Sequence, residues 1–297
     1  MKSNQVLNGD VRELAKELVP NSIQTIITSP PYFGLRKYSK DAVESKNEIG
    51  REQTITEYID DLVSVFENLK PALKKDGTVW VNLGDSYVKG NLQGAPWRFA
   101  LAMQDKGWIL RSDIIWHKPN AMPSSVKNRP TTDHEYIFLF TLDHKNYYYN
   151  ADAIREEHVT FSENSKMKGG RNHLGKKGGT PEQGKNAGNS NLHNGRWDQA
   201  FHPLGRNKRT VWNIPLGKYK GAHFAVFPEK LVETCLLAAT KAGDTVLDPF
   251  FGSGTTGLVA LKHNRYYLGI ELVSEYAELA QSRLNEFSTQ LNLFENK

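Results

Sequence analysis

The stretch "TVLDPFFGSGTTGLVALKHNRYYLGIEL", residues 245–272, decides the fold. A short apolar run leads into a G-x-G-x-x-G pattern that begins at Gly252, and a helix-forming segment then leads to a second apolar run at 266–270. Glycines between a strand and a helix let the backbone turn tightly and approach a ligand closely. The carboxylate of Glu271, at the end of the second run, can accept hydrogen bonds from the two hydroxyls of a ribose. The stretch therefore indicates a strand–helix–strand unit that binds a nucleoside-containing cofactor.

An acidic residue, Asp248, stands just ahead of the glycines and narrows the choice of cofactor. The glycine pattern alone is also typical of NAD-binding dehydrogenases. A carboxylate at this place suits a cationic group better than a pyrophosphate. S-adenosylmethionine carries an α-ammonium and a sulfonium and has no phosphate, so the sequence favours it.

Short apolar runs alternate with amphipathic segments along the rest of the chain. We expect helices from about Thr56, over 229–241 and over 274–288, the first with Ile59, Leu62, Phe66 and Leu69 on its apolar face. This alternation predicts an α/β fold with a mostly parallel, doubly wound sheet. The expected strands are 23–28, 78–83, 112–117, 135–141, 244–248 and 266–270.

Composition restricts the class of protein. The 297 residues suffice for a full α/β core, and 38% hydrophobic and 24% charged residues are ordinary for a globular protein. No stretch approaches 18 apolar residues and the start of the chain lacks an apolar signal segment, so we expect no membrane association and no secretion. The single cysteine, Cys235, excludes a disulfide framework and fits a cytoplasmic location. No Cys/His cluster has zinc-ligand spacing, so no metal is predicted.

The net charge of +5 is concentrated in one segment. Residues 151–220 hold 13 Lys/Arg and 6 Asp/Glu, a balance of +7, so the remaining residues sum to 5 − 7 = −2. The segment is also rich in Gly and Asn, which leaves little to bury. It is interpreted either as a solvated insertion or as a surface for polyanions such as nucleic acid, and charge alone does not decide between them.

A second unusual strand end is "TSPPY", residues 28–32. Together with "DPFFGSGTTG" at 248–257, it resembles the motif pair of site-specific DNA amino-methyltransferases. The catalytic motif precedes the cofactor motif with a basic insertion between them, an order that resembles the β class of restriction–modification enzymes. Further matching segments are "LNGD" at 7–10, "LKPALKKDGTVWVNLGDSY" at 69–87, "IIWHKPNAMPSSVKNRPTTDHEYIFLF" at 114–140 and "HFAVFPEKLVE" at 223–233.

This resemblance implies a Rossmann-like, S-adenosylmethionine-dependent methyltransferase whose sheet is circularly permuted, mostly parallel and seven-stranded with one antiparallel strand. Residues 1–150 would form the catalytic half and 221–297 the cofactor-binding half of the same domain. Residues 151–220 would be the target-recognition insertion, partly flexible. The implied partner is double-stranded DNA, and a cognate restriction endonuclease and a second copy of the chain are further candidates.

The resemblance implies that a methyl group is transferred to the exocyclic amine of a base flipped out of duplex DNA. Ser29 and the Pro30 carbonyl would accept hydrogen bonds from the two N–H groups of the amine, as their counterparts do in the family. Acceptors aimed at developing charge stabilise the transition state. Prolines fix the backbone and bring no competing N–H. Tyr32 would supply a face on which the flipped base stacks. The adenine-N6 members usually have Asp or Asn at the position of Ser29, so "SPPY" favours cytosine N4, and adenine N6 is the alternative.

Individual site residues follow from the same resemblance. Two histidines, His117 and His134, are predicted to have packing roles rather than general-base roles. The catalytic residues are Ser29, Pro30, Pro31 and Tyr32. The cofactor-binding residues are Asp10, Val11, Phe227, Pro228, Asp248, Pro249, Phe250, Gly252, Ser253, Gly254, Thr255 and Glu271. The predicted DNA-binding residues are chosen instead for their positive charge and for the stacking surface of Trp197, and they are Arg36, Lys37, Arg196, Trp197, Arg206, Lys208 and Arg209.

Three other functions are less well supported by the sequence. A nicotinamide-dependent oxidoreductase is one alternative, but it leaves "TSPPY" unexplained. At the level of a single residue, Asp10 has a turn or helix-cap role as its alternative to cofactor binding. A DNA-binding module with a vestigial cofactor site would bind DNA without methyl transfer. Methylation at cytosine C5 is disfavoured because it needs a thiolate nucleophile, and Cys235 lies in the apolar stripe of a predicted helix.

Overall fold

The computed structural model describes residues 4–35, 37–39, 41–157, 204–217 and 228–295. The chain divides into two compact units. The first unit consists of residues 1–150 and 210–297, and the second consists of residues 151–209.

The first unit is built on one sheet with the strand order β1-β10-β9-β2-β3-β7-β6-β8. All neighbouring strands are parallel except where β7 pairs with β3 and β6, so β7 is the one antiparallel strand. The strands are β1 (Gln5–Asn8), β2 (Ile23–Thr28), β3 (Leu73–Leu83), β6 (Ile109–His117), β7 (His134–Thr141), β8 (Val211–Asn213), β9 (Thr245–Asp248) and β10 (Tyr266–Glu271).

The mostly parallel sheet with one antiparallel strand agrees with the expectation from the sequence. The sheet of the described residues has eight strands instead of seven, because β8 adds a short strand at the edge beside β6. Trp212 of β8 is buried, and its ring centroid lies 6.3 Å from that of Trp80 on β3. A small separate hairpin is formed by β4 (Tyr87–Val88) and β5 (Asn91–Leu92).

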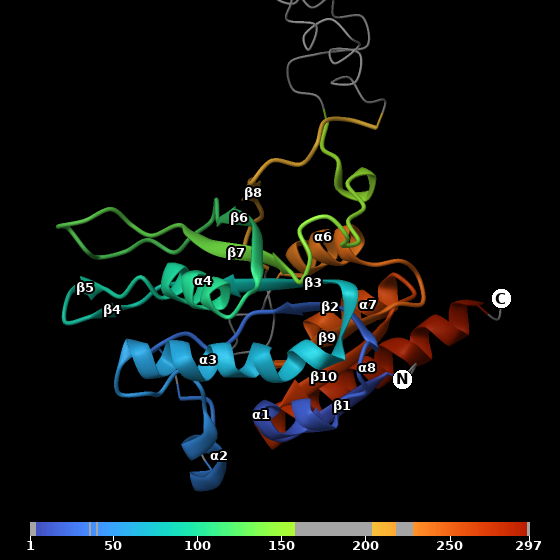
Figure 1. Cartoon of the computed structure of the whole chain (residues 1–297), viewed down its shortest axis with the longest axis horizontal. Helices are drawn as coiled ribbons and strands as arrows, with labels where there is room; N and C mark the ends of the chain where they lie inside the picture. The colour runs from blue at the N-terminus through green and yellow to red at the C-terminus, as the bar shows by residue number, and fades with distance from the viewer. Residues whose placement is uncertain (1–3, 36, 40, 158–203, 218–227, 296–297) are drawn as a thin grey trace, which may run out of the picture. The chain divides into compact units, whose positions relative to one another are not determined.

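Helices cover both faces of this sheet (Figure 1). One group packs together on one face and contains α1 (Val11–Leu14), α3 (Ile55–Leu69) and α4 (Ala95–Asp105). The other group contains α6 (Glu229–Ala239), α7 (Thr255–Lys262) and α8 (Ser274–Glu295). The short helix α2 (Ala42–Asn47) lies in the segment that follows "TSPPY".

The main core lies between α3 and the sheet. Thr54 begins α3 with a capping box: its side chain accepts from the Glu57 N–H, and the Glu57 side chain accepts from the Thr54 N–H. The helix buries its apolar face, including all four residues predicted from its periodicity, against alternate residues of β3 and β7. Cys235 is fully buried on α6, in accordance with the packing role that the sequence predicts.

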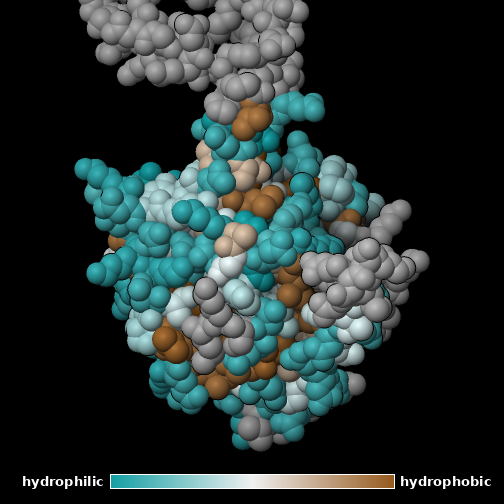
Figure 2. Space-filling model, turned by 90° about the vertical axis from the view of Figure 1, so that its right-hand side faces the viewer, coloured by the Kyte–Doolittle hydropathy of each residue, from teal (hydrophilic) through white to brown (hydrophobic). Residues whose placement is uncertain are grey.

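Hydrophilic residues occupy most of the described surface on the face drawn in Figure 2, and hydrophobic residues form small separate groups there. Within the described ranges, no helix has both the length and the apolar character that crossing a bilayer would require.

Gly269 of β10 is a testable packing constraint. A Cβ atom added there would lie 2.3 Å from Cγ of Phe251, so Gly269→Ala is expected to lower the free energy of unfolding by about 2 kcal/mol through overpacking. The measurement is urea unfolding followed by circular dichroism. Gly217→Ala is the control, since an added Cβ meets no atom within 4 Å there. Equal stability of the two variants would contradict the prediction.

Candidate active site

The two sequence motifs meet at the carboxyl edge of the sheet. Strand β2 leads to β3 on one side and β9 leads to β10 on the other, so the chain order reverses between the paired strands β2 and β9. Ligands of open α/β sheets bind at the carboxyl ends of the strands beside such a reversal. A cavity of about 950 Å³ lies here, and both Ser29 and Gly252 line it.

The glycine turn after β9 is fastened to Glu271. Gly252 and Gly254 have φ of +52° and +78°, in the left-handed region that favours glycine. The Gly252 N–H donates to Oε2 of Glu271 at 2.7 Å, and the Val273 N–H donates to Oε1 at 2.9 Å. Burial raises the pKa of Glu271, which is 8% exposed. Each carboxylate oxygen has a second lone pair, so Glu271 can still accept from ligand hydroxyls.

Asp248 is a buried carboxylate at the end of β9. Oδ1 accepts from the Thr28 hydroxyl at 2.6 Å and from the Phe250 N–H at 3.1 Å, and Oδ2 accepts from the Thr256 hydroxyl at 2.7 Å. Burial raises its pKa to about 7, against the opposing effect of these hydrogen bonds. No described Lys or Arg is among its hydrogen-bond or ion-pair partners, so a cationic ligand would supply the missing countercharge.

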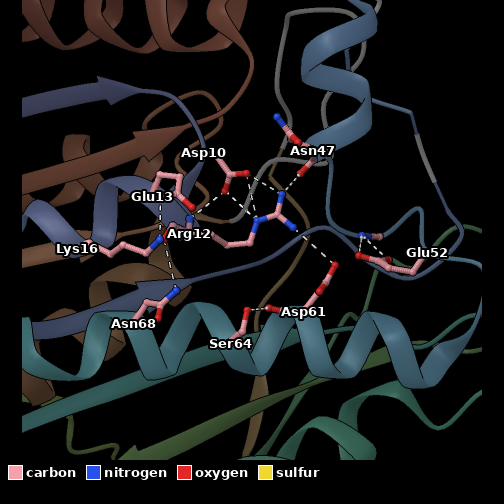
Figure 3. Close-up of polar contacts among 10 residues, drawn as sticks. Asp10, Arg12, Glu13, Lys16, Asn47, Glu52, Asp61, Ser64 and Asn68 are labelled. Carbon is pink, nitrogen blue, oxygen red and sulfur yellow. Dashed lines mark hydrogen bonds and ion pairs between the residues drawn. The ribbon is translucent and has the colours of Figure 1, made fainter.

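Asp10 is held by Arg12 in a fork (Figure 3). The Arg12 backbone N–H and Nε donate to Oδ1 at 2.9 and 3.0 Å, and Nη2 lies 2.6 Å from Oδ2. Asp10 is thereby the N-cap of α1, which is the alternative structural role that the sequence predicts for it, and it also lines the cavity. Arg12 also donates to the Asn47 carbonyl and approaches Asp61, so it ties α1 to both α2 and α3.

The charge of the cavity wall fits a phosphate-free, cationic ligand. Five acidic side chains line it, namely Asp10, Glu48, Glu135, Asp248 and Glu271. Lys118 is the one basic side chain among the described lining residues, and it is paired with Glu135. A pyrophosphate would meet net repulsion here, whereas an ammonium, a sulfonium and ribose hydroxyls find acceptors.

The loop after β2 is rigidly supported. The Tyr58 hydroxyl of α3 donates to the Pro31 carbonyl at 2.9 Å, and Ser29 and Pro30 precede this anchor. No hydrogen bond from a described residue reaches the Pro30 carbonyl. All four residues predicted to be catalytic line the cavity.

A polar network that the sequence did not reveal surrounds Ser29. Asn82 of β3 places Nδ2 3.2 Å from Ser29 Oγ, 2.8 Å from the Tyr32 hydroxyl and 2.8 Å from Oε2 of Glu135. The Tyr32 hydroxyl donates to Glu135 at 2.6 Å, and Lys118 is ion-paired with the other oxygen of Glu135. Asn82 is 1% exposed, and its Oδ1 has no partner among the described residues. The sequence does hold one sign of this network, because Asn82 is a polar residue inside the apolar run of β3.

Most of the residues predicted to bind the cofactor line the same cavity. Pro228 is buried at the start of α6 and Gly254 lies in the turn, but neither belongs to the lining, and Phe227 lies outside the described residues. The residues that do line it are Asp10, Val11, Asp248, Pro249, Phe250, Gly252, Ser253, Thr255 and Glu271. Neither His117 nor His134 lines the cavity.

The residues predicted to bind DNA are only partly described. Arg36, Arg196 and Trp197 lie outside the described residues, and Lys37 is exposed. Within the second unit, Nε of Arg206 lies 3.4 Å from Oε1 of Glu156, and the backbones of these two residues pair. Lys208 and Arg209 also lie in the described part of this unit.

Comparison with known proteins shows the family. A family model described as DNA methylase matches residues 23–282. The Type II methyltransferase M.Cfr9I of Citrobacter freundii is 39% identical over 315 aligned residues, which cover 96% of this chain and 89% of that protein. The Type II methyltransferase M.SmaI of Serratia marcescens is 38% identical, covering 96% of this chain and 91% of its own.

A solved structure has the same fold. The PvuII DNA methyltransferase, described as cytosine-N4-specific, superposes with a TM-score of 0.65 at 21% identity, covering 98% of this chain and 93% of that one. The chain therefore belongs to the DNA methylase family, the amino-methyltransferases of restriction–modification systems, as its two motifs predict.

Proposed function

We propose that this DNA methyltransferase transfers a methyl group from S-adenosylmethionine to the N4 amine of cytosine in duplex DNA, after the base has left the helix. The observation that carries the proposal is that a single cavity is lined by Ser29 and Pro30 and also by Asp248 and Glu271. The first pair suits an amine, and the second suits a cationic nucleoside. The proposed place of action is the cytoplasm, on the basis of the single cysteine and the lack of an apolar signal segment.

The residues present fit the cofactor. Asp248 would hold the α-ammonium and Glu271 the ribose hydroxyls, while Ser253 and Thr255 would donate to the carboxylate. Asp10 and Val11 would lie at the adenine, as would Phe250. When bound, S-adenosylmethionine supplies a methyl group made electrophilic by the positive sulfur.

The residues of the loop after β2 would prepare the target amine. Its lone pair is delocalised into the ring, so the nitrogen must move toward tetrahedral geometry before it can attack. Ser29 Oγ and the Pro30 carbonyl would accept its two N–H bonds and favour that geometry. The hydrogen bond from Tyr58 to Pro31 would keep both acceptors in place.

Cytosine is favoured over adenine by the side chain at position 29. In adenine-specific relatives this position usually holds Asp or Asn, whereas here it is Ser29. The PvuII enzyme, described as cytosine-N4-specific, shares the fold. N6 methylation of adenine is the alternative, and an analysis of the methylated nucleosides distinguishes the two. The nicotinamide-dependent alternative has no support from the family or from the acidic cavity wall.

The segment 151–220 is proposed to be the target-recognition region, with residues 1–150 and 221–297 as the catalytic and cofactor-binding halves of one domain. Its basic residues would neutralise phosphates of duplex DNA. A cognate endonuclease and a homodimer are proposed on the family resemblance alone.

The decisive experiment is a product analysis. Unmethylated duplex DNA of mixed sequence is incubated with the protein and S-adenosylmethionine labelled in the methyl group, then digested to nucleosides and separated by chromatography. We expect the label in N4-methyl-2′-deoxycytidine. Label in N6-methyl-2′-deoxyadenosine would establish the alternative, and DNA binding without any labelled nucleoside would refute the proposal.

Glu271→Gln is expected to weaken the binding of S-adenosylmethionine about 10- to 100-fold, because it removes charge from the acceptor of the ribose hydroxyls. The measurement is titration calorimetry. The control is Glu278→Gln, which makes the same change on the exposed side of α8. Equal affinity of both variants would exclude the proposed role of Glu271.

A further inference from the structure

The hydrogen bonds around Ser29 have a fixed direction. Tyr32 has a single hydroxyl hydrogen, and the 2.6 Å bond to Glu135 uses it. Burial, and then the charge of Glu135, raise the pKa of Tyr32 well above its ordinary value, so the hydroxyl keeps its proton. The Ser29 and Tyr32 oxygens are 3.3 Å apart. Because the Tyr32 hydrogen is already used, the hydrogen in that contact must come from Ser29.

Asn82 reinforces the same direction. Its amide nitrogen carries two hydrogens and faces three oxygens, those of Ser29, Tyr32 and Glu135. Turning the amide over would place Oδ1 at 2.8 Å from the Glu135 carboxylate, where two acceptors would repel each other. The nitrogen therefore faces the network, and the buried Oδ1 is left without a partner among the described residues.

Lys118 holds the carboxylate at the end of the network in place. It is ion-paired with Glu135, and both side chains are largely buried, with 16% and 14% of their surface exposed. Its ammonium also lies 4.5 Å from the centroid of the Trp116 ring. A carboxylate fixed in this way is a strong hydrogen-bond acceptor for Tyr32.

We propose that Glu135 and Tyr32 are positioning residues that polarise Ser29: its hydroxyl hydrogen points to Tyr32, one lone pair accepts from Asn82, and the other lone pair is left for the target amine. The inference rests on the proposed function, because it needs an amine as the substrate. It explains how a serine can accept a hydrogen bond from the target amine at a position where relatives use an acidic or amide side chain. A hydroxyl that donates its own hydrogen to a chain of hydrogen bonds becomes a better acceptor.

The test is a double-mutant cycle measured by single-turnover methyl transfer with saturating cofactor and DNA. Tyr32→Phe keeps the ring and removes the hydroxyl, and Glu135→Gln keeps the shape and removes the charge. Each is expected to lower the transfer rate about 10- to 100-fold, with binding of cofactor and DNA changed less than about twofold. In a Ser29→Ala background, each should lower the rate by less than about twofold, since the hydroxyl they polarise is gone.

Tyr58→Phe is the matched control. It removes the same kind of hydroxyl, but one that holds the Pro31 carbonyl, so its effect should multiply with that of Ser29→Ala. Unchanged rates for Tyr32→Phe and Glu135→Gln would overturn the inference. Effects that multiply with Ser29→Ala, or losses explained by weaker binding, would overturn it as well. Failure of the wild-type protein to methylate DNA would instead refute the proposed function, and this inference with it.

Discussion

Ser29→Ala is expected to slow methyl transfer to DNA about 10²- to 10³-fold and to change the affinities for cofactor and DNA less than about twofold. The magnitude is that of removing one well-placed hydrogen-bonding group that acts on developing charge. The reason is geometric: Ser29 lines the cavity beside Asp248 and Glu271, and its hydroxyl is held by Asn82 and Tyr32. Truncation leaves the Pro30 carbonyl as the remaining acceptor, so transfer should not stop entirely.

Single-turnover assays with excess enzyme measure such slow rates, and calorimetry measures both affinities. Ser22→Ala is the control, because Ser22 lies just before the opposite end of β2 and its exposed hydroxyl donates to the Val19 carbonyl. A Ser29→Ala variant that transfers methyl groups at the wild-type rate would show that the hydroxyl does not take part in the reaction.

The fold was predictable where apolar runs are long enough to be distinctive. The run at 23–28 coincides with β2, and the expected strand at 135–141 falls within β7. The strands β1 and β8 were missed because they have four and three residues and lie at the edges of the sheet, where burial imposes no clear pattern. Pairing with β10 and β6 makes them strands, and pairing partners are not visible in a local sequence window.

The site was predictable where a strand end carries an unusual motif, as at Ser29 and Asp248. The residues that support these motifs come from other elements and were missed. Thr28 holds Asp248 across the boundary between β2 and β9, and Thr256 holds it from the start of α7, although each looks like an ordinary residue in the sequence. Asn82 lies within an expected strand, but its role depends on contacts 50 or more residues away in the chain.

Asp248 also has an expected effect on stability. Its ordinary pKa is 3.8 and its pKa in the fold is about 7. Between these values the folded protein holds a proton that the unfolded chain does not, so the contribution of Asp248 to stability is most favourable below about pH 4 and declines as pH rises to 7. The ionised group then costs on the order of 4 kcal/mol. In the cofactor-free protein, Asp248 is thus most destabilising where it is charged and ready for a cation.

Asp248→Asn is therefore expected to raise stability and to destroy cofactor binding. Both threonine hydroxyls can still pair with an amide, so the free energy of unfolding at pH 8 should rise by roughly 2–4 kcal/mol in the cofactor-free protein. The affinity for S-adenosylmethionine should fall about 100-fold, because the ammonium would be buried beside a neutral group. Urea unfolding and calorimetry measure the two effects.

Proton linkage distinguishes this explanation from a general loss of shape. At pH 6 most of the cofactor-free protein holds the proton on Asp248, so binding of the cation must release it, and calorimetry in buffers of different ionisation enthalpy should detect that release. Asp248→Asn should abolish it. Asp244→Asn, a control at the other end of β9 beside Lys74, should leave both affinity and proton release unchanged. If the cofactor binds Asp248→Asn as tightly as the wild type, the ammonium lies elsewhere, and the free-energy cost of burying the ionised Asp248 would need another explanation.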